Sequence, residues 1–401
     1  MLFQNAFHEG FGTWPLAYIA AGGADYGEVL AVAKAVGDGG DDAYYDAWMQ
    51  AGYRLEQEAR DCLAAGSLPG ARSQYLKAAA FYATSYHPIY GEPVDPRLTQ
   101  AFLKQKAALE AGLALCSKGF VALQIPFEGQ TLPGLFVPAE GRETEVRPLL
   151  ILTNGYDGTL TDMYFASAVA ASRRGYHCLL FDGPGQGEAL VLKGLRLRPD
   201  WETVVKAVVD VAETLPIVDP DRIALSGWSL GGYLAARAAS AEHRLAACIA
   251  DPGLWDILGN FRPMAIAMGA SPEQAQKLGT LDDALLQKFQ QVITADRRSR
   301  WAIVQRGFWV HGVATLQDYL KSAELFTLDG RAEEIRCPTL IAAAENDPLS
   351  LSAERVFETL RCQKTFQRFT AAEGADGHCE MKNRSLFNRR TLDWLDQVLG
   401  V

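Results

Sequence analysis

The spacing of apolar residues over positions 1–118 is that of α-helices. Between 41 and 64, apolar side chains recur three or four residues apart, which predicts a long amphipathic helix. A second helix is expected over 71–86. A third should begin at Pro96, because Asp95 is a suitable N-cap and proline is favoured at the first helical position. No repeat period continues beyond these helices, so the pattern predicts a helical N-terminal domain rather than a solenoid.

From about residue 119 the chain changes to short apolar runs. Two of them, 121–127 and 132–138, flank the turn Glu128-Gly129-Gln130 and predict a β-hairpin. Later runs alternate with helical patterns: strands are expected at 149–153, 178–181, 223–225, 247–250, 339–344 and 364–369, and helices near 160–173, 201–214, 351–360 and 384–399, with one more directly after Ser229. Strands that alternate with helices form a mostly parallel sheet covered on both faces. Residues 119–401 are therefore expected to form an α/β core.

One connection in this core is abnormally long. Some 87 residues separate Asp251 from Thr339, and they carry helical patterns but no convincing strand. Connections of this size inside a compact domain are usually functional, typically as a lid over a binding site. We therefore expect a helical lid insertion at about 253–330. Its aromatic residues suggest an apolar roof: Trp255, Phe261, Trp301, Phe308 and Trp309.

The run Gly-Trp-Ser-Leu-Gly-Gly at 227–232 carries the clearest chemical signal. An apolar run precedes it and a helical pattern follows, so Gly-x-Ser-x-Gly lies at a strand-to-helix turn. Such a turn exposes one serine, Ser229, and needs glycine at 227 and 231, where a side chain would collide with the neighbouring strand or helix. The helix begins at this serine, so its unpaired N–H groups point to the place where an oxyanion would form. The pattern predicts that Ser229 is a nucleophile.

A serine nucleophile needs a base, and the base needs an acid that holds its tautomer. In folds with this turn the order along the chain is serine, acid, histidine. His378 lies beyond Ser229, in a loop after the expected strand at 364–369, and is therefore the predicted base. The other histidines fit less well: His8, His87 and His177 precede the serine, His243 directly follows the helix after it, and His311 lies inside the long connection. A surface loop histidine is the alternative interpretation of His378.

Asp347 is the predicted acid, because it follows the expected strand at 339–344 in a polar turn. Three other carboxylates compete with it: Glu345, Asp376 and Asp251, of which Asp251 ends the preceding strand, a position that some hydrolases use. A plain turn-forming aspartate before Pro348 is the alternative interpretation of Asp347.

Two backbone N–H groups are needed for an oxyanion hole. One is expected from Leu230, directly after the nucleophile, and the other from Tyr156 in the loop 154–158. The run Asp-Gly-Pro-Gly-Gln-Gly at 182–187 lacks the Gly-x-Gly-x-x-Gly spacing of nucleotide-binding turns, and a proline interrupts it. We interpret it as a structural turn near the site, and we expect no cofactor and no metal ion.

Composition narrows the class of protein further. With 49% hydrophobic and 21% charged residues, the chain can bury a large core, and its net charge of −10 argues against a nucleic-acid partner. Seven scattered cysteines without CxxC spacing favour neither a disulfide framework nor a zinc site. Neither a signal-like N-terminus nor a run of 18 apolar residues is present, so we expect a cytoplasmic protein without a membrane span.

Several motifs together resemble the α/β-hydrolases that carry a helical N-terminal cap: NGYDG after a strand, FDGPGQGE, GWSLGGYLAARAAS, CPTLIAAAENDP and EGADGHCE. This group includes dihydroxypseudooxynicotine hydrolase, fungal polyketide chain-shortening hydrolases and the fermentation–respiration switch proteins. The resemblance extends to the helices around Trp48 and 75–82, and so over most of the chain. Asn154 departs from it, because many of these hydrolases have His or Gly there.

The resemblance implies an α/β-hydrolase fold with a cap domain over 1–118, and a Ser229, Asp347 and His378 triad in a cleft between cap and core. It also implies hydrolysis of a C–C bond next to a ketone, or of an ester, in an aromatic or polyketide-like substrate. The sequence thus predicts a metal-independent serine hydrolase with a small apolar or aromatic substrate. An ordinary carboxylesterase or peptidase-like acyl hydrolase and a non-catalytic regulatory protein of the same fold stay open as alternatives, as does a homodimer.

Overall fold

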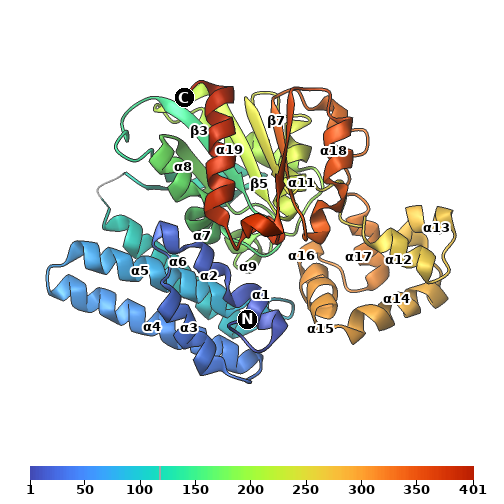
Figure 1. The fold of residues 1–401 in the computed structure, drawn as a ribbon, viewed down its shortest axis with the longest axis horizontal. Coiled ribbons are helices and arrows are strands. Elements are labelled where there is room, and N and C mark those ends of the chain that lie inside the picture. The colour runs from blue at the N-terminus through green and yellow to red at the C-terminus, as the bar shows by residue number, and fades with distance from the viewer. Residues whose placement is uncertain (117–118) are drawn as a thin grey trace.

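The core of the molecule is an eight-stranded sheet. The computed structural model describes residues 1–116 and 119–401, and within them the strands are ordered β1-β2-β4-β3-β5-β6-β7-β8 (Figure 1). Their bounds are β1 (Val121–Phe127), β2 (Gln130–Val137), β3 (Arg147–Thr153), β4 (His177–Phe181), β5 (Val218–Trp228), β6 (Ala247–Asp251), β7 (Thr339–Ala344) and β8 (Lys364–Phe369). β2 pairs antiparallel with β1 and with β4, and the other neighbours are parallel. This confirms the expected α/β-hydrolase fold.

Helices cover the sheet because its central strands are apolar on both faces. The helices between and after the strands are α7 (Leu160–Met163), a π-helical stretch (Tyr164–Ala168), α8 (Val169–Arg174), α9 (Gly187–Val191), α10 (Trp201–Ala212), α11 (Leu230–Ala239), α18 (Ala353–Thr359) and α19 (Arg384–Leu399). α8 packs on α19, and α10 packs on α11. β4, β6 and β7 are buried along their whole length, as expected for strands between two helical layers.

The N-terminal region is helical, and it lies below the core in Figure 1. Its helices are α1 (Ala6–Gly12), α2 (Trp14–Ala17), α3 (Tyr26–Val36), α4 (Asp41–Ala64), α5 (Leu68–Ser85) and α6 (Pro96–Ala114). α4 has the predicted bounds, and α6 begins at Pro96 behind the Asp95 cap as predicted. α5 begins at Leu68, three residues before the expected start, because Pro69 fits the first turn of a helix. The expected boundary after residue 118 falls on residues outside this description.

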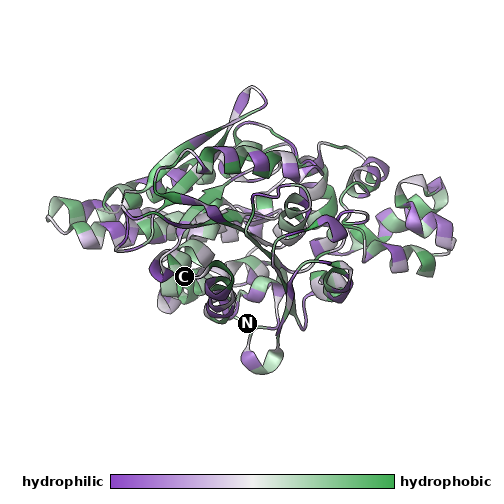
Figure 2. Cartoon of the chain, turned by 90° about the horizontal axis from the view of Figure 1, so that it is seen from above, coloured by the Kyte–Doolittle hydropathy of each residue, from purple (hydrophilic) through white to green (hydrophobic). Residues whose placement is uncertain are grey.

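The helices between β6 and β7, called the insertion below, run from Phe261 to Ala323 and lie at the other end of the molecule from the α4–α5 turn (Figures 1 and 2). Its elements are α12 (Phe261–Ala267), α13 (Pro272–Gln276), α14 (Asp283–Ala295), α15 (Arg297–Ser299), a π-helical stretch (Arg300–Gly307), α16 (Phe308–His311) and α17 (Leu316–Ala323). The insertion has an apolar cluster of its own, which includes Leu278, Phe289 and Leu320. It also touches the N-terminal helices, since the Trp301 indole N–H donates to the His87 carbonyl at 2.8 Å.

Several strand limits differ from those expected. β5 extends from Val218, five residues before the apolar run at 223, because Val218 pairs with Arg147 of β3; a register shift follows, and regular pairing resumes where Ile223 meets Leu149. β3 itself begins at Arg147, two residues before the expected start. The hairpin turn is one residue shorter than expected, since β2 begins at Gln130. Pairing at these strand ends is made by the backbone and leaves no periodic apolar pattern.

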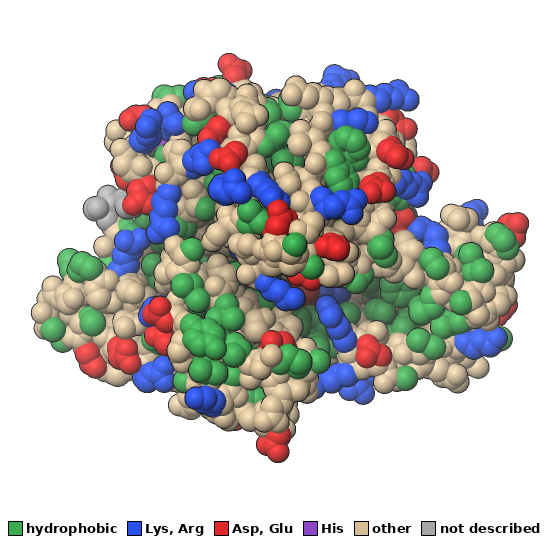
Figure 3. Space-filling model, viewed as in Figure 1, with side chains coloured by type: hydrophobic (Ala, Val, Ile, Leu, Met, Phe, Trp, Pro, Cys, Tyr) green, Lys and Arg blue, Asp and Glu red, His purple; other side chains and the backbone are tan. Residues whose placement is uncertain are grey.

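The surface shows mixed chemistry. Hydrophilic and hydrophobic residues alternate along the outer helices in Figure 2, and side chains of both charges are interspersed on the face drawn in Figure 3. Among the described residues, no helix is both long enough and apolar enough to cross a membrane.

Candidate active site

Ser229 stands alone between β5 and α11, in a turn of strained backbone. Its φ and ψ are 59° and −130°, a left-handed φ that residues other than glycine seldom adopt. Both neighbouring glycines are needed. A Cβ at Gly227 would lie 1.9 Å from the Gly231 carbonyl oxygen, and one at Gly231 would lie 2.7 Å from the carbonyl oxygens of Thr153 and Asn154. The predicted strand-to-helix turn is therefore present, with the packing that it requires.

The structure brings Ser229, His378 and Asp347 into one hydrogen-bonded chain. Nε2 of His378 lies 2.9 Å from the Ser229 hydroxyl oxygen, and Nδ1 lies 2.8 Å from Oδ2 of Asp347. The second oxygen of Asp347 accepts the Leu349 backbone N–H at 3.0 Å, and its side chain is 2% exposed. With Nδ1–H donating to Asp347, Nε2 is free to accept the serine proton. These three residues are the ones that the sequence order predicted as a triad.

The pKa of His378 is raised above its usual value of 6.5. Withdrawal from water lowers it, but the charge of Asp347 and the hydrogen bond to that carboxylate outweigh the burial. The more distant carboxylates of Asp251 and Asp157 act in the same direction. An imidazole with such a pKa accepts a proton readily.

The three competing carboxylates have other partners. Glu345 accepts the backbone N–H of Ala371 at 2.8 Å, and Asp376 accepts the side-chain amide of Asn346 at 2.8 Å. Asp251 is ion-paired with Arg384 at 2.7 Å, in a buried position. Asp347 is thus the one of the four candidates that contacts His378.

The Asp251–Arg384 pair anchors the segment that carries His378. The same Arg384 guanidinium donates to the carbonyl oxygen of Cys379 at 2.8 Å. This contact holds two residues with left-handed backbone, Cys379 (φ 52°) and Glu380 (φ 48°). Glu380 is 1% exposed, and neither carboxyl oxygen has a hydrogen-bond partner. Burial, and then the charge of Asp251, raise the pKa of Glu380 well above 4.5, which favours the uncharged form of this side chain.

The loop 154–158 lies directly against the turn that carries Ser229. An added Cβ at Gly155 would be 2.9 Å from the Leu230 backbone nitrogen and 3.0 Å from the Ser229 hydroxyl oxygen, so only glycine leaves this space open. Tyr156 follows at once. The two residues predicted for the oxyanion hole, Tyr156 and Leu230, therefore belong to backbone segments that pack together beside Ser229.

The predicted structural turn at 182–187 supports this loop. Gln186 donates to the carbonyl oxygens of Asn154 (2.6 Å) and Gly155 (3.2 Å). Asp182 accepts the side-chain amide of Asn154 at 3.1 Å, and the other end of that amide accepts the Trp228 indole N–H at 3.0 Å. Asn154 thus connects the loop with Asp182, directly after β4, and with Trp228 at the end of β5. Its side-chain N–H donates to the first, and its side-chain oxygen accepts from the second.

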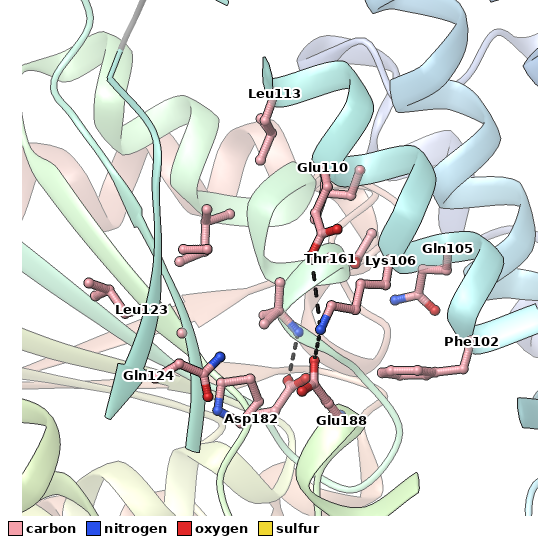
Figure 4. A pocket seen from close by; sticks show the side chains of 16 residues that line it. Phe102, Gln105, Lys106, Glu110, Leu113, Leu123, Gln124, Thr161, Asp182 and Glu188 are labelled. Carbon is pink, nitrogen blue, oxygen red and sulfur yellow. Dashed lines mark hydrogen bonds and ion pairs between the residues drawn. The ribbon is translucent and has the colours of Figure 1, made fainter. Parts of the chain in front are cut away.

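A larger cavity lies behind this turn, between α6, the β1–β2 hairpin and α9 (Figure 4). Its lining includes Asp182, whose pKa burial raises to about 7, and the 2.6 Å ion pair between Lys106 and Glu188. None of Ser229, Asp347 and His378 lines it. The backbone N–H groups of Leu160 and Glu188 donate to the Asp182 carboxylate. We therefore infer that Asp182 has a structural role and holds the turn in place.

The cavity over Ser229 holds about 280 Å³ of empty volume, open solvent included. Besides Ser229 and His378, it is lined by Trp14, Asp157, Gly158, Trp228, Cys379 and Met381. Trp14 comes from α2, and its ring centroid lies 5.9 Å from that of Trp228. The sequence did not single out Trp14, Asp157 or Met381, because no spacing pattern connects these three segments. Among the described residues, no group of three or more His, Cys, Asp or Glu side chains is arranged to hold a metal ion.

The fold and the contacts of Ser229 define a class of hydrolases. The chain belongs to the Alpha/beta hydrolase family, whose model matches residues 149–384. It is 31% identical to Hydrolase LUC6 of Fusarium sp, over 94% of this chain and 93% of that protein. It is also 31% identical to 20-hydroxy-prefusarin hydrolase FUS2 of Gibberella moniliformis, again over 94% and 93%. The crystal structure of 2,6-dihydroxy-pseudo-oxynicotine hydrolase shares the fold, with a TM-score of 0.73 and 22% identity over 96% of this chain and 95% of that one.

Proposed function

We propose that the protein is a serine hydrolase in which Ser229 attacks a substrate carbonyl. His378 takes the hydroxyl proton at Nε2, and Asp347 holds the imidazole and stabilises the imidazolium that forms. The hydrogen-bonded chain of Ser229, His378 and Asp347, with contacts of 2.9 and 2.8 Å, is the observation that carries this proposal. The backbone N–H groups of Tyr156 and Leu230 stabilise the oxyanion.

The bond that breaks is, in this proposal, a C–C bond next to a ketone, or an ester C–O bond. When the tetrahedral intermediate collapses, His378 returns the proton to the leaving carbon or oxygen, and Ser229 keeps the acyl group. Water, activated by the same imidazole, then releases the acid, so that one water molecule is consumed for each bond cut. A carbon leaving group has to be a stabilised carbanion, such as a phenol-ring or β-dicarbonyl carbon.

Two observations support an aromatic or polyketide-like substrate. The cavity over Ser229 has two indole walls, Trp14 and Trp228, which suit a flat apolar group. One of the relatives with 31% identity is named a hydrolase of 20-hydroxy-prefusarin.

Labelling with a fluorophosphonate probe tests the nucleophile. Wild-type protein is expected to take up one probe per chain and lose activity toward p-nitrophenyl acetate, whereas Ser229→Ala should remain unlabelled and inactive. Ser226→Ala, three residues earlier in β5, serves as a matched control and should label like the wild type. Equal labelling of Ser229→Ala and wild type would refute the proposal.

A pair of substrate types separates C–C from C–O cleavage. Turnover of acyl-phenol ketones is compared with turnover of p-nitrophenyl esters that carry the same acyl group. Release of the free phenol from the ketone at a rate within about 10-fold of that of the ester favours C–C hydrolysis. Turnover of the esters alone favours the carboxylesterase alternative.

A further inference from the structure

The helical insertion reaches the loop beside Ser229 through one arginine. Arg306 lies in the π-helical stretch Arg300–Gly307, and its Nη1 donates to both carboxylate oxygens of Asp157, at 2.8 and 2.7 Å. The guanidinium carbon also lies 4.2 Å from the ring centroid of Tyr156, in cation–π geometry. Only 12% of the Arg306 side chain is exposed, so the ion pair is largely shielded from water. π-helical stretches occur frequently at functional sites.

A second contact from the insertion holds the same loop. The Tyr156 hydroxyl lies 2.6 Å from Nε2 of His311, whose Nδ1 lies 2.8 Å from the Ser322 hydroxyl. Burial, and then the charge of Arg306, lower the pKa of His311 to about 3, so the ring is neutral and one nitrogen accepts while the other donates. Tyr156 is thus fixed at its ring face by Arg306 and at its hydroxyl by His311.

Core residues hold the first half of the loop. Asn154 and Gly155 are bound through Gln186 and Trp228, as described above. Arg306 and His311 of the insertion hold the side chains of Asp157 and Tyr156. The backbone that has to present the Tyr156 N–H therefore lies between a core anchor and an insertion anchor.

We propose that Arg306 is a positioning residue for catalysis: by clamping Asp157 and Tyr156, it sets the Tyr156 N–H opposite that of Leu230 and so completes the oxyanion hole. The insertion, which was expected to roof the cavity but supplies none of its lining residues, then contributes to the chemical step through Arg306. This inference rests on the proposed serine-hydrolase function. Oxyanion donors act only when they are fixed before the charge develops, so a loosened loop weakens the transition state more than substrate binding.

Three variants test the inference on a small ester that does not reach the insertion. Arg306→Met keeps the length of the side chain without its charge, and Arg306→Lys keeps the charge without the planar group. Arg262→Met is the matched control, because Arg262 makes the same kind of ion pair with Asp256 inside the insertion, at 2.7 and 2.8 Å. Kinetics are measured with p-nitrophenyl acetate, together with inhibition by a phenyl trifluoromethyl ketone, which forms an oxyanion on the serine.

For Arg306→Met we expect kcat to fall by about 10- to 100-fold with KM within about twofold, because removal of a whole oxyanion donor costs about 10²- to 10³-fold. The inhibition constant of the trifluoromethyl ketone should rise by a similar factor, and Arg306→Lys should recover part of both losses. Arg262→Met should match the wild type. If Arg306→Met does not fold, Asp157→Asn is measured in its place, with the same two quantities: kcat for p-nitrophenyl acetate and the inhibition constant of the ketone.

Folded Arg306 or Asp157 variants with wild-type kcat and wild-type ketone inhibition would overturn the inference, as would an equal loss in Arg262→Met. A change in KM alone would also overturn it, since it would indicate substrate contact rather than positioning. Failure of the wild-type protein to label or to hydrolyse the ester would instead refute the proposed function.

Discussion

At the scale of single residues, Glu380 is the least expected feature of the site. It lies two residues after His378, 1% exposed, in left-handed backbone, and it shares the Arg384 guanidinium with Asp251. One guanidinium can neutralise one carboxylate, and Asp251 makes the 2.7 Å contact while Glu380 lies at 3.7 Å. The protonated form of Glu380 is therefore favoured, because two buried like charges are costly.

The raised pKa of Glu380 predicts how stability depends on pH. Its folded-state pKa lies well above the unfolded-state value near 4.5, so its contribution is fully favourable below pH 4.5 and is lost as the pH rises toward the folded-state pKa. Glu380→Gln imitates the protonated form at every pH. Between pH 5 and pH 8.5 the melting temperature of this variant should fall less than that of the wild type, by about 1 °C for each kcal/mol involved.

Thermal unfolding of both proteins at the two pH values, followed by circular dichroism, measures the effect. Glu354→Gln is the control, because the Glu354 side chain is 72% exposed, and it should follow the wild type. Parallel pH curves for Glu380→Gln and wild type would show that the carboxyl group is ionised in the folded protein.

At the scale of elements, the turn that carries Ser229 depends on the close approach of β5 and α11. The distance of 1.9 Å from a Cβ at Gly227 to the Gly231 carbonyl oxygen involves backbone on both sides, so no side-chain rotation can relieve it. The strained φ of Ser229 is held between these two elements. Strain of this kind persists only where the surrounding structure fixes it.

Gly227→Ala is therefore expected to destabilise the protein by about 1–3 kcal/mol through overpacking and to lower kcat as Ser229 shifts. Urea unfolding and ester kinetics measure the two effects. Gly10→Ala in α1 is the matched control: nothing lies within 4 Å of its Cβ position, and alanine in a helix should gain about 0.5–1 kcal/mol. Unchanged stability and kcat in Gly227→Ala would contradict the close approach.

The elements themselves were largely predictable from the sequence. β7, β8 and α19 have the expected bounds, because short strand-like runs and an amphipathic helix leave clear patterns. The start of α5 was missed because Pro69 stands between Gly66 and Gly70, a composition typical of a break between helices. The start of β5 was missed because polar residues and a proline separate Val218 from the apolar run at 223. The order serine, acid, histidine indicated the three residues that the structure brings together.

At the scale of the whole molecule, two parts of the chain line the cavity over Ser229 and a third holds the loop beside it. The core provides the hydrogen-bonded chain, the N-terminal helices provide Trp14, and the insertion provides Arg306, which binds Asp157. The sequence could not predict Trp14 and Arg306, because no motif connects either of them with Ser229, whereas the order serine, acid, histidine connects Ser229 with His378. Their packing is visible in the contacts of His87, which meets Trp14 at 5.0 Å between ring centroids and accepts from Trp301.

Trp14 should accordingly select substrates by size. Its ring is one wall of the cavity, so truncation removes a contact to a bulky substrate, together with the ring contacts that Trp14 makes to His87 and Trp228. For Trp14→Ala we expect kcat/KM to fall about 10-fold for an aryl ester such as p-nitrophenyl phenylacetate, which corresponds to about 1.4 kcal/mol of lost contact. Turnover of p-nitrophenyl acetate, too small to reach the indole, should stay within twofold. An equal loss of kcat/KM for both esters would mean that Trp14 supports the fold of the site and does not contact the substrate. Unchanged kcat/KM for both esters would mean that the bound acyl group lies away from the N-terminal helices.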